Sequence, residues 1–437
     1  MPARDDNTVR IAILLDDLSG GGVERSMLTL AGGFRRRGHT VDLILARRAG
    51  PLESEVPANM RVLVLPENAD LGVRLAIARA DPGGIGVLAR PLLLARRKRL
   101  GRMPARLPSL VAYLRRERPD VLLAAKLRPN LAAVWARRLA RVPTRVVLTE
   151  RTSPSEHFPM GRNKGRNQDV RHLMHRTYPQ ADAIVTVSRD LADDLARFAD
   201  LPRASIQPIY NPVVDSRLEE AARETPDHPW LAEGEPPVIL AVGRIEPRKG
   251  FTTLLRAFAQ VRERRPVRLV ILGGMKNEAG GHEQALLDLA RQFGIEADLS
   301  LPGFRLNPFA YMARAAVFVL PSEYEGLPGV LIQALACGCP VVSTDCPTGP
   351  REILEGGRYG PLVPVGDHRA MADAIAATLD DPLPPDLLRE RGREFGVDAS
   401  TDAYLALFDE LRGEARSSSE ARDVERPVDS PHAEFSA

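Results

Sequence analysis

The chain has 437 residues, of which 44% are hydrophobic and 27% are charged, close to the averages of soluble globular proteins. This composition excludes a collagen, a mainly disordered chain and a polytopic membrane protein, and the length allows two or three domains. The net charge is only +3, but it is unevenly distributed. Residues 1–215 carry 36 Lys/Arg against 22 Asp/Glu (net +14), and residues 216–437 carry 24 against 35 (net −11). The first half is therefore expected to meet an anionic partner.

The apolar runs and the cysteines bear on the compartment. The first apolar run, residues 9–15, is shorter than the core of a signal peptide, and no run reaches the roughly 18 residues of a spanning helix. Cys337, Cys339 and Cys346 lie within ten positions of one another and form neither a disulfide framework nor a zinc pattern. We expect a reducing, cytoplasmic location.

The first half of the chain alternates strand and helix patterns. A strand is expected at 9–15, a glycine-rich turn at Gly20, Gly21 and Gly22, a helix at 23–37 and a parallel second strand at 41–45. Further strands are expected at 61–65, 121–125, 145–149, 183–187 and 205–210, with helices at 131–141 and 189–198 among those between them. This alternation predicts a doubly wound α/β domain over residues 1–212.

A second α/β pattern follows a linker expected at 213–237, which is rich in Pro, Glu and Asp. Its strands are expected at 238–242, 268–272, 317–320 and 341–344, and its helices at 252–264, 283–293 and 330–336. We predict a second Rossmann-like domain at 238–397, a helix at 398–414 packing back on the first domain, and a disordered tail at 415–437. The carboxyl ends of both parallel sheets would face a cleft between the domains, where ligands bind.

The glycine-rich turn is the first motif that could carry chemistry. Gly20, Gly21 and Gly22 would let the backbone approach a phosphate at the positive end of the next helix, although a plain tight turn explains them too. The dinucleotide fingerprint G-x-G-x-x-G fails, because Arg25 occupies the third glycine position. This disfavours a dehydrogenase.

The second motif, residues 243–250, directly follows a strand and precedes a helix. It would place Arg244 and Lys249 at the mouth of the cleft, where two fixed cations could neutralise a diphosphate as its leaving-group charge grows. Lys249 is one of only five lysines, so composition alone does not explain it. A solvated basic loop is the alternative interpretation.

The third motif, residues 321–329, is a Pro/Gly loop between a strand and an apolar helix. The loop would hold Glu325 in the cleft, and the helix start would present free N–H groups to an anion. Gln333, one turn into the helix, would lean back toward the same end. An ordinary strand, loop and helix with a capping carboxylate is the alternative.

Together with residues 336–354 and 362–367, these two motifs resemble the C-terminal signature of the family 4 glycosyltransferases, which are retaining nucleotide-sugar transferases of the two-Rossmann GT-B fold. The glycine-rich turn and the Tyr-Asn-Pro-Val sequence at 210–213 are also similar to that family. The resemblance spans about residues 8–414 and is densest at 238–366.

The resemblance implies roles for individual residues. Arg244 and Lys249 would hold the donor diphosphate, Glu325 would contact the transferred sugar, and neither a cofactor nor an essential metal would be needed. The donor site would also include Gly243, Gly326, Gly329, Val330, Leu331 and Gln333.

One departure from the family signature concerns its two glutamates, which lie eight positions apart. Here they are Glu325 and Gln333. A glutamine can still accept a hydrogen bond from the nucleotide ribose, so activity is expected. A catalytically weakened homologue that acts as a binding protein is the alternative. A nucleotide-sugar 2-epimerase shares the fold, but it would need an acid/base set that the sequence does not supply.

Acceptor recognition is expected on the first domain, at Asn130, Glu150 and Arg151, which follow strand ends. The stretch Arg90–Arg118 holds ten Lys/Arg and one acid, which suits a peripheral contact with anionic lipid at the inner face of the cell membrane, although a solvated face explains it too. Nucleic acid is disfavoured, because no aromatic residue interleaves the stretch before Tyr113. We therefore expect transfer of a hexose or N-acetylhexosamine, from UDP rather than GDP, to a glycan or lipid-linked acceptor in bacterial envelope or exopolysaccharide synthesis.

Overall fold

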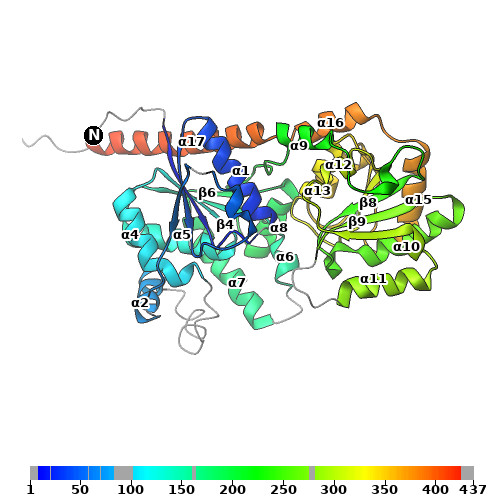
Figure 1. Ribbon diagram of the computed structural model, residues 1–437. Coiled ribbons are helices and arrows are strands. Elements are labelled where there is room, and N and C mark those ends of the chain that lie inside the picture. The colour runs from blue at the N-terminus through cyan, green and yellow to red at the C-terminus, as the bar shows by residue number, and fades with distance from the viewer. Residues whose placement is uncertain are drawn as a thin grey trace, which may run out of the picture.

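The computed structural model describes residues 8–19, 21–57, 59–68, 70–82, 102–159, 164–274 and 281–424. Within these ranges the chain forms two α/β domains side by side, each built on a parallel sheet covered by helices (Figure 1). Gly20 and most of the basic stretch, residues 90–101, lie outside the described residues. None of the described helices is long and apolar enough to cross a membrane.

The N-terminal domain contains a sheet whose seven described strands run in the order β3-β2-β1-β4-β5-β6-β7. Most of its central strand residues are buried, because helices cover both faces of a parallel sheet. The strands are β1 (Arg10–Leu15), β2 (Thr40–Leu45), β3 (Arg61–Val64), β4 (Val121–Ala125), β5 (Arg145–Glu150), β6 (Ala183–Thr186) and β7 (Ile206–Pro208). The helices include α1 (Gly22–Arg36), α2 (Asp70–Ala80), α4 (Leu107–Glu117), α5 (Leu127–Ala140), α6 (Pro154–His157), α7 (Lys164–Thr177) and α8 (Arg189–Ala199).

The C-terminal domain repeats the design with the strand order β10-β9-β8-β11-β12-β13 among its described residues. Its strands are β8 (Val238–Val242), β9 (Arg268–Leu272), β10 (Leu299–Gly303), β11 (Val317–Leu320), β12 (Val341–Thr344) and β13 (Leu362–Val363). Its helices are α9 (Ser216–Ala222), α10 (Phe251–Arg264), α11 (Gly281–Gln292), α12 (Phe309–Met312), α13 (Gly329–Ala336), α14 (Pro350–Ile353), α15 (His368–Asp380) and α16 (Pro385–Arg393). The order reverses between β8 and β11, as it does between β1 and β4, and such a reversal opens a crevice at the carboxyl ends of the strands.

The chain crosses between the domains twice, and the two crossings lie side by side. The N–H groups of Val213 and Val214 donate to the carbonyl of Phe395 at 3.0 and 3.2 Å, and the N–H of Val397 donates to Val214 O at 3.0 Å. We call these two hydrogen-bonded crossings, at residues 211–214 and 395–397, the hinge.

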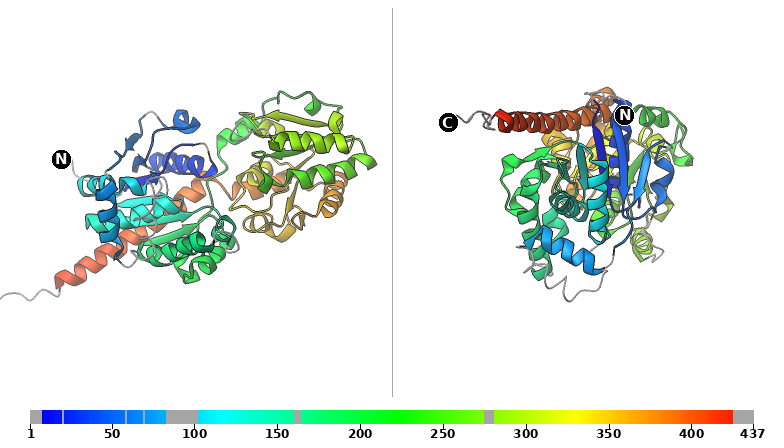
Figure 2. Two further views of the ribbon diagram at one scale, coloured as in Figure 1. Left: turned by 90° about the horizontal axis from the view of Figure 1, so that it is seen from below. Right: turned by 90° about the vertical axis from the view of Figure 1, so that its left-hand side faces the viewer.

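After the second crossing, α17 (Val397–Val424) runs back along the N-terminal domain (Figure 2). Tyr404 and Phe408 of α17 stack against Phe34 of α1, with ring centroids 6.3 and 5.6 Å apart. In the structure α17 continues to Val424, so it includes residues 415–424 of the predicted tail, and residues 425–437 lie outside the described residues.

The predicted fold class of two doubly wound parallel-sheet domains is confirmed. Strands β10 and β13 are not among those predicted from the sequence. Both lie at the edges of the C-terminal sheet, and β13 is only two residues long.

Candidate functional site

The second and third motifs meet where β8 and β11, neighbours in the C-terminal sheet, reach their carboxyl ends. The Lys249 Nζ lies 2.5 Å from Glu325 Oε1, and the two side chains are only 12% and 10% exposed. The Ser322 hydroxyl donates to the same carboxylate oxygen at 2.7 Å. An Arg248 nitrogen lies 3.6 Å from the other oxygen. The structure therefore fixes Glu325 from several sides.

Arg244 is the more accessible cation of this group, with 46% of its side chain exposed. It lies 3.4 Å from Glu246, a carboxylate that also pairs with Arg248 at 2.6 Å. The cluster thus holds three cations, Arg244, Arg248 and Lys249, against two carboxylates. An entering anion would find an excess of positive charge on prearranged groups.

Gly250 fixes how the two loops meet. It ends the short 3₁₀ turn Pro247–Lys249 with φ +66°, and a Cβ at this position would lie 1.9 Å from Pro321 O. Only glycine tolerates both this φ and this close approach. The Glu323 N–H donates to Arg248 O at 2.8 Å across the same junction. Backbone contacts therefore place the lysine loop against the glutamate loop.

Helix α13 begins at this junction without a side-chain cap. The motif predicts that N–H groups from Gly329 to Leu331 face a phosphate. The Leu331 N–H already donates to Pro328 O at 3.0 Å, so the available donors are those of Gly329 and Val330. Gln333 is half-buried one turn further along. Among the described residues, no group of three or more His, Cys, Asp or Glu is placed to hold a metal.

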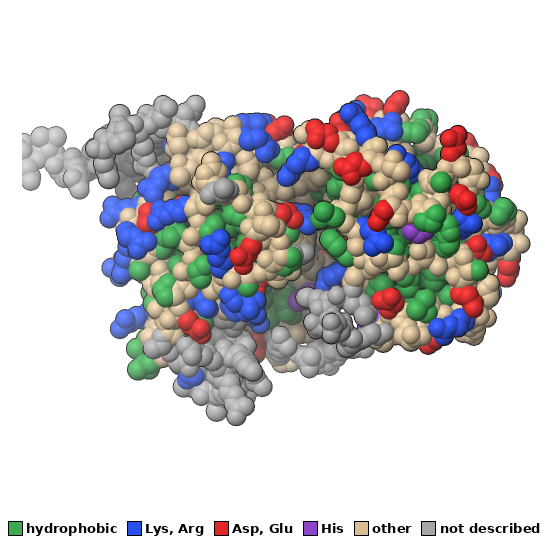
Figure 3. Space-filling model, in the orientation of Figure 1, with side chains coloured by type: hydrophobic (Ala, Val, Ile, Leu, Met, Phe, Trp, Pro, Cys, Tyr) green, Lys and Arg blue, Asp and Glu red, His purple; other side chains and the backbone are tan. Residues whose placement is uncertain are grey.

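Across the cleft, the reversal between β1 and β4 carries Glu24 and Lys126, whose charged ends form an ion pair. Gly21 caps α1, and a Cβ there would lie 2.6 Å from a Glu24 oxygen. Lys126 has φ +77°, an uncommon conformation for a residue with a side chain. The space-filling view shows a hollow between the two domains on the face that is turned toward the viewer (Figure 3).

Asn130 and Glu150, two of the three residues expected to bind the acceptor, are buried. The Asn130 side-chain amide donates to Glu150 Oε1 at 3.0 Å, and the Tyr178 hydroxyl donates to the same oxygen. Burial raises the pKa of Glu150 to about 7. The Tyr178 contact has no signature in the sequence, because 28 positions separate the two residues. Their role in acceptor binding stays a prediction.

Arg151, the third, is also buried and points toward the hinge. Its guanidinium donates to Ser26 Oγ at 2.7 Å and to Asn211 in the first crossing, and it lies 3.5 Å from the Tyr404 hydroxyl. In this arrangement it connects α1, the crossing and α17 rather than offering free donors to an acceptor.

The Glu325 loop also touches the N-terminal domain directly. The Gly326 carbonyl accepts a hydrogen bond from Ser188 Oγ at 3.3 Å, and a Cβ on Gly326 would lie 2.3 Å from Arg151 O. Gly326 therefore allows a close backbone approach of the two domains beside Glu325.

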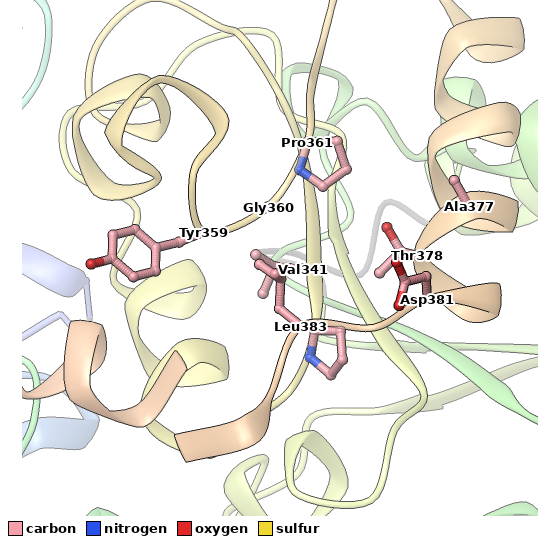
Figure 4. Close-up of a pocket in the computed structure, with 9 residues that line it drawn as sticks. Val341, Tyr359, Gly360, Pro361, Ala377, Thr378, Asp381 and Leu383 are labelled. Atoms are coloured by element: carbon pink, nitrogen blue, oxygen red, sulfur yellow. The ribbon is translucent and has the colours of Figure 1, made fainter. Parts of the chain in front are cut away.

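A separate cavity of about 270 Å³ opens at the opposite end of the C-terminal sheet (Figure 4). Val341 and Pro361 line it at the amino ends of β12 and β13, together with Tyr359 and Leu383. The Thr378 hydroxyl in its wall is bonded within its own helix to Ala374 O. The cavity thus lies away from Lys249 and Glu325 and is not the predicted site.

Two family models match the chain. The model described as Glycosyltransferase Family 4 matches residues 20–217, and the model described as Glycosyl transferases group 1 matches residues 236–381. The two matches fall on the N-terminal and the C-terminal domain.

Curated relatives agree. The chain is 32% identical over 254 residues, 58% of this chain and 65% of the relative, to a Campylobacter jejuni N-acetylgalactosamine-N,N'-diacetylbacillosaminyl-diphospho-undecaprenol 4-alpha-N-acetylgalactosaminyltransferase. It is 30% identical over 315 residues, 69% of this chain and 79% of the relative, to the lipopolysaccharide core biosynthesis glycosyltransferase LpsE of Rhizobium meliloti. The match to the first thus spans just under two thirds of that protein.

Solved structures share the fold. A glycosyltransferase of Rickettsia africae superposes with a TM-score of 0.70 at 15% identity, covering 93% of this chain and 99% of that one. The Anabaena protein HepE, in complex with UDP and glucose, superposes with a TM-score of 0.64 at 20% identity, covering 94% and 100%. The chain therefore belongs to the family 4 (group 1) glycosyltransferases, and its two domains have the GT-B fold.

Proposed function

We propose that the protein is a retaining glycosyltransferase that moves a hexose or N-acetylhexosamine from a UDP-sugar to a glycan or lipid-linked acceptor of the bacterial envelope or an exopolysaccharide. The observation that carries the proposal is the pairing of Lys249 with Glu325, beside Arg244, at the carboxyl ends of β8 and β11. The relatives' names support the acceptor class, and the UDP in the HepE complex supports the nucleotide.

The charges suit a departing diphosphate. As the bond between the sugar C1 and the phosphate oxygen breaks, negative charge grows on that oxygen, and Arg244 and Lys249 stabilise it. The N–H groups at the start of α13 add a positive helix end to the same anion. These fixed cations take the role that a divalent metal would otherwise have, so we propose metal-independent transfer. Activity that survives EDTA treatment is the expected result.

Glu325 is proposed to orient the transferred sugar through its hydroxyl groups. A double-displacement route would require a carboxylate that attacks C1 from the face opposite the leaving group. Glu325 is instead held by Lys249 and Ser322, on the side proposed for the diphosphate. We propose that the acceptor hydroxyl enters on the leaving-group face. Its oxygen bonds to C1, and its proton passes to the departing phosphate oxygen.

The first test is a thermal-shift panel with UDP, GDP, ADP and NADP. A ligand at 100 times its dissociation constant stabilises the native state by about 2.7 kcal/mol, which raises the melting temperature by roughly 2–4 °C per kcal/mol. A shift with UDP that disappears in Arg244→Ala supports the proposal, and UDP release from UDP-hexoses and UDP-N-acetylhexosamines then identifies the donor. A shift with NADP alone would overturn it.

Gln333 stands where the family signature has its second glutamate, and a glutamine cannot act as an acid or base. This substitution favours one second candidate, a binding protein with weakened catalysis. The position of Gln333 one turn into α13 suits a hydrogen bond to the ribose, which needs an acceptor oxygen and no charge. Turnover by the wild-type protein that changes little in Gln333→Glu would support the transferase. Donor binding without turnover until glutamate is introduced would support the binding protein.

We propose that the enzyme works at the cytoplasmic face of the cell membrane, with Arg90–Arg118 as its peripheral contact. Apolar side chains support this assignment. On α2, which packs against α4, Leu71 and Leu75 lie one turn apart and are 71% and 49% exposed. Exposed leucines beside a basic stretch suit an anionic lipid surface.

A further inference from the structure

Helix α8 of the N-terminal domain begins at the border between the domains (Figure 1). A carboxylate of the C-terminal domain lies against its first turn. Glu352, from α14, accepts from the Arg189 N–H through both oxygens, at 3.1 and 2.8 Å. It also accepts from the Asp190 N–H at 3.4 Å. A negative charge at a helix start satisfies free N–H groups and the helix dipole together.

A third contact reaches the hinge. The Tyr210 hydroxyl, just before the first crossing, donates to Glu352 Oε1 at 2.6 Å. Burial, followed by this hydrogen bond, raises the pKa of Tyr210, so the hydroxyl keeps its proton at neutral pH. The Glu352 side chain is only 10% exposed. Charge-assisted bonds in such a shielded position are stronger than those at an open surface.

The same end of α8 also touches the loop that holds Glu325. Ser188 caps α8 by accepting from the Leu191 N–H at 3.1 Å, and its hydroxyl donates to Gly326 O at 3.3 Å. Val187 and Leu191 are buried in one apolar cluster with residues of the C-terminal domain, which include Leu327, Leu331 and Ile353. Polar and apolar contacts thus join at one small interface beside the candidate site.

We propose that Glu352 is a positioning residue: by capping α8 across the domain border, it latches the N-terminal domain onto the 321–329 loop and sets the cleft width at which Glu325 faces the acceptor side. The latch itself concerns only how the two domains are held relative to each other. Its consequence for transfer rests on the proposed function.

Domain spacing tests the latch without any substrate. The three native cysteines are buried, so a spin label should react only with cysteines introduced at the surface. The exposed residues His172 in α7 and Ala285 in α11 lie in opposite domains, and both are replaced by cysteine for labelling. Pulsed electron paramagnetic resonance then measures the distance between the two spin labels. We expect Glu352→Ala to lengthen and broaden this distance, and Tyr210→Phe to do so less. The control is Arg358→Ala, because this nearby residue is exposed and pairs with Glu355 inside the C-terminal domain.

The kinetic readout separates positioning from general damage. The donor groups lie within the C-terminal domain, so Glu352→Ala should leave the Kd for UDP within about twofold, while kcat/KM for the acceptor falls at least tenfold. Glu352→Gln keeps an acceptor oxygen but loses the charge, so it should recover part of that loss. An unchanged label distance in both Glu352→Ala and Tyr210→Phe would overturn the latch, as would equal widening in Arg358→Ala. A widened distance in a protein that never turns over a donor would support the latch and count against the proposed function.

Discussion

At the residue scale, the charges of Lys249 and Glu325 compensate each other, because both side chains are almost completely buried. Removing one partner of such a pair leaves an uncompensated buried charge and typically costs about 3–5 kcal/mol. We expect Lys249→Met to lower the free energy of unfolding by an amount near the lower end of that range, because Ser322 and Arg248 still contact Glu325. Turnover should fall about 10²–10³-fold, as when one stabilising donor is lost.

Denaturant unfolding and donor turnover check this prediction together. Lys249→Met combined with Glu325→Gln removes both charges, so it should recover most of the stability and none of the activity. Wild-type turnover in Lys249→Met would contradict the proposed role of the lysine.

A second residue, Glu150, should make stability depend on pH. Burial raises its pKa from 4.5 to about 7, so the folded protein keeps a proton that the unfolded chain releases between these values. Stability therefore falls as pH rises from about 5 to about 7. At about 1.4 kcal/mol per pKa unit, Glu150→Gln should be more stable than wild type by up to about 3 kcal/mol at pH 8, with little difference at pH 5.

Urea unfolding at both pH values measures this effect, and Glu117 provides a control of opposite sign. Hydrogen bonds from Arg61 and then Arg116 lower the pKa of Glu117 to about 2, so its charged form stabilises the fold above the unfolded pKa. Glu117→Gln should therefore lose stability at pH 8. If Glu150→Gln were equally destabilised at both pH values, the hydrogen bonds of this carboxyl would stabilise the fold more than its buried charge destabilises it.

At the scale of elements, the backbone of the glutamate loop lies directly against the residue that follows β5. A Cβ at position 326 would lie 2.3 Å from Arg151 O, so Gly326→Ala must push the domains apart. We expect the transfer rate to fall more than the affinity for UDP, because Arg244 and Lys249, the proposed ligands of the diphosphate, both lie within the C-terminal domain. Titration with UDP and acceptor kinetics measure the two quantities.

Gly413→Ala is the matched glycine substitution, because a Cβ in this exposed turn of α17 meets nothing within 4 Å. It should gain about 0.5–1 kcal/mol from helix propensity and leave transfer unchanged. An equal loss of transfer in both variants would show that the effect is not specific to the domain contact.

The elements also show what sequence patterns can and cannot predict. The central strands and α10, α11 and α13 fall within a few residues of their predicted positions, because buried parallel strands and amphipathic helices leave strong patterns. Strand β10 was missed because Pro302 and Gly303 break its pattern at a sheet edge. The motifs indicated Lys249 and Glu325, but no spacing in the chain could show that Glu352 caps α8 or that Arg151 turns toward Asn211. Those contacts depend on how two domains meet.

At the scale of the whole molecule, the unequal distribution of charge along the chain should orient the protein on an anionic membrane. The net charge of +14 over residues 1–215 should draw the N-terminal domain to anionic lipid. Residues 216–396 of the C-terminal domain carry 20 Lys/Arg against 25 Asp/Glu (net −5) and should be repelled by the same surface. We expect flotation with vesicles of phosphatidylglycerol, none with neutral phosphatidylcholine, and release as salt shortens the screening length from about 10 Å at 0.1 M to about 3 Å at 1 M.

Substitution of Arg96, Arg97, Lys98 and Arg99 by serine should abolish most of this binding, since each cation near the surface contributes about 1 kcal/mol. Serine at Arg256, Arg291, Arg369 and Arg389 of the C-terminal domain removes the same charge, and this control should float like wild type. Equal losses in the two variants would mean that net charge, rather than the basic stretch, holds the protein to the vesicle. Flotation that is insensitive to both would leave the exposed leucines of α2 as the contact, and Leu71→Ser with Leu75→Ser would then be the pair of substitutions that releases it.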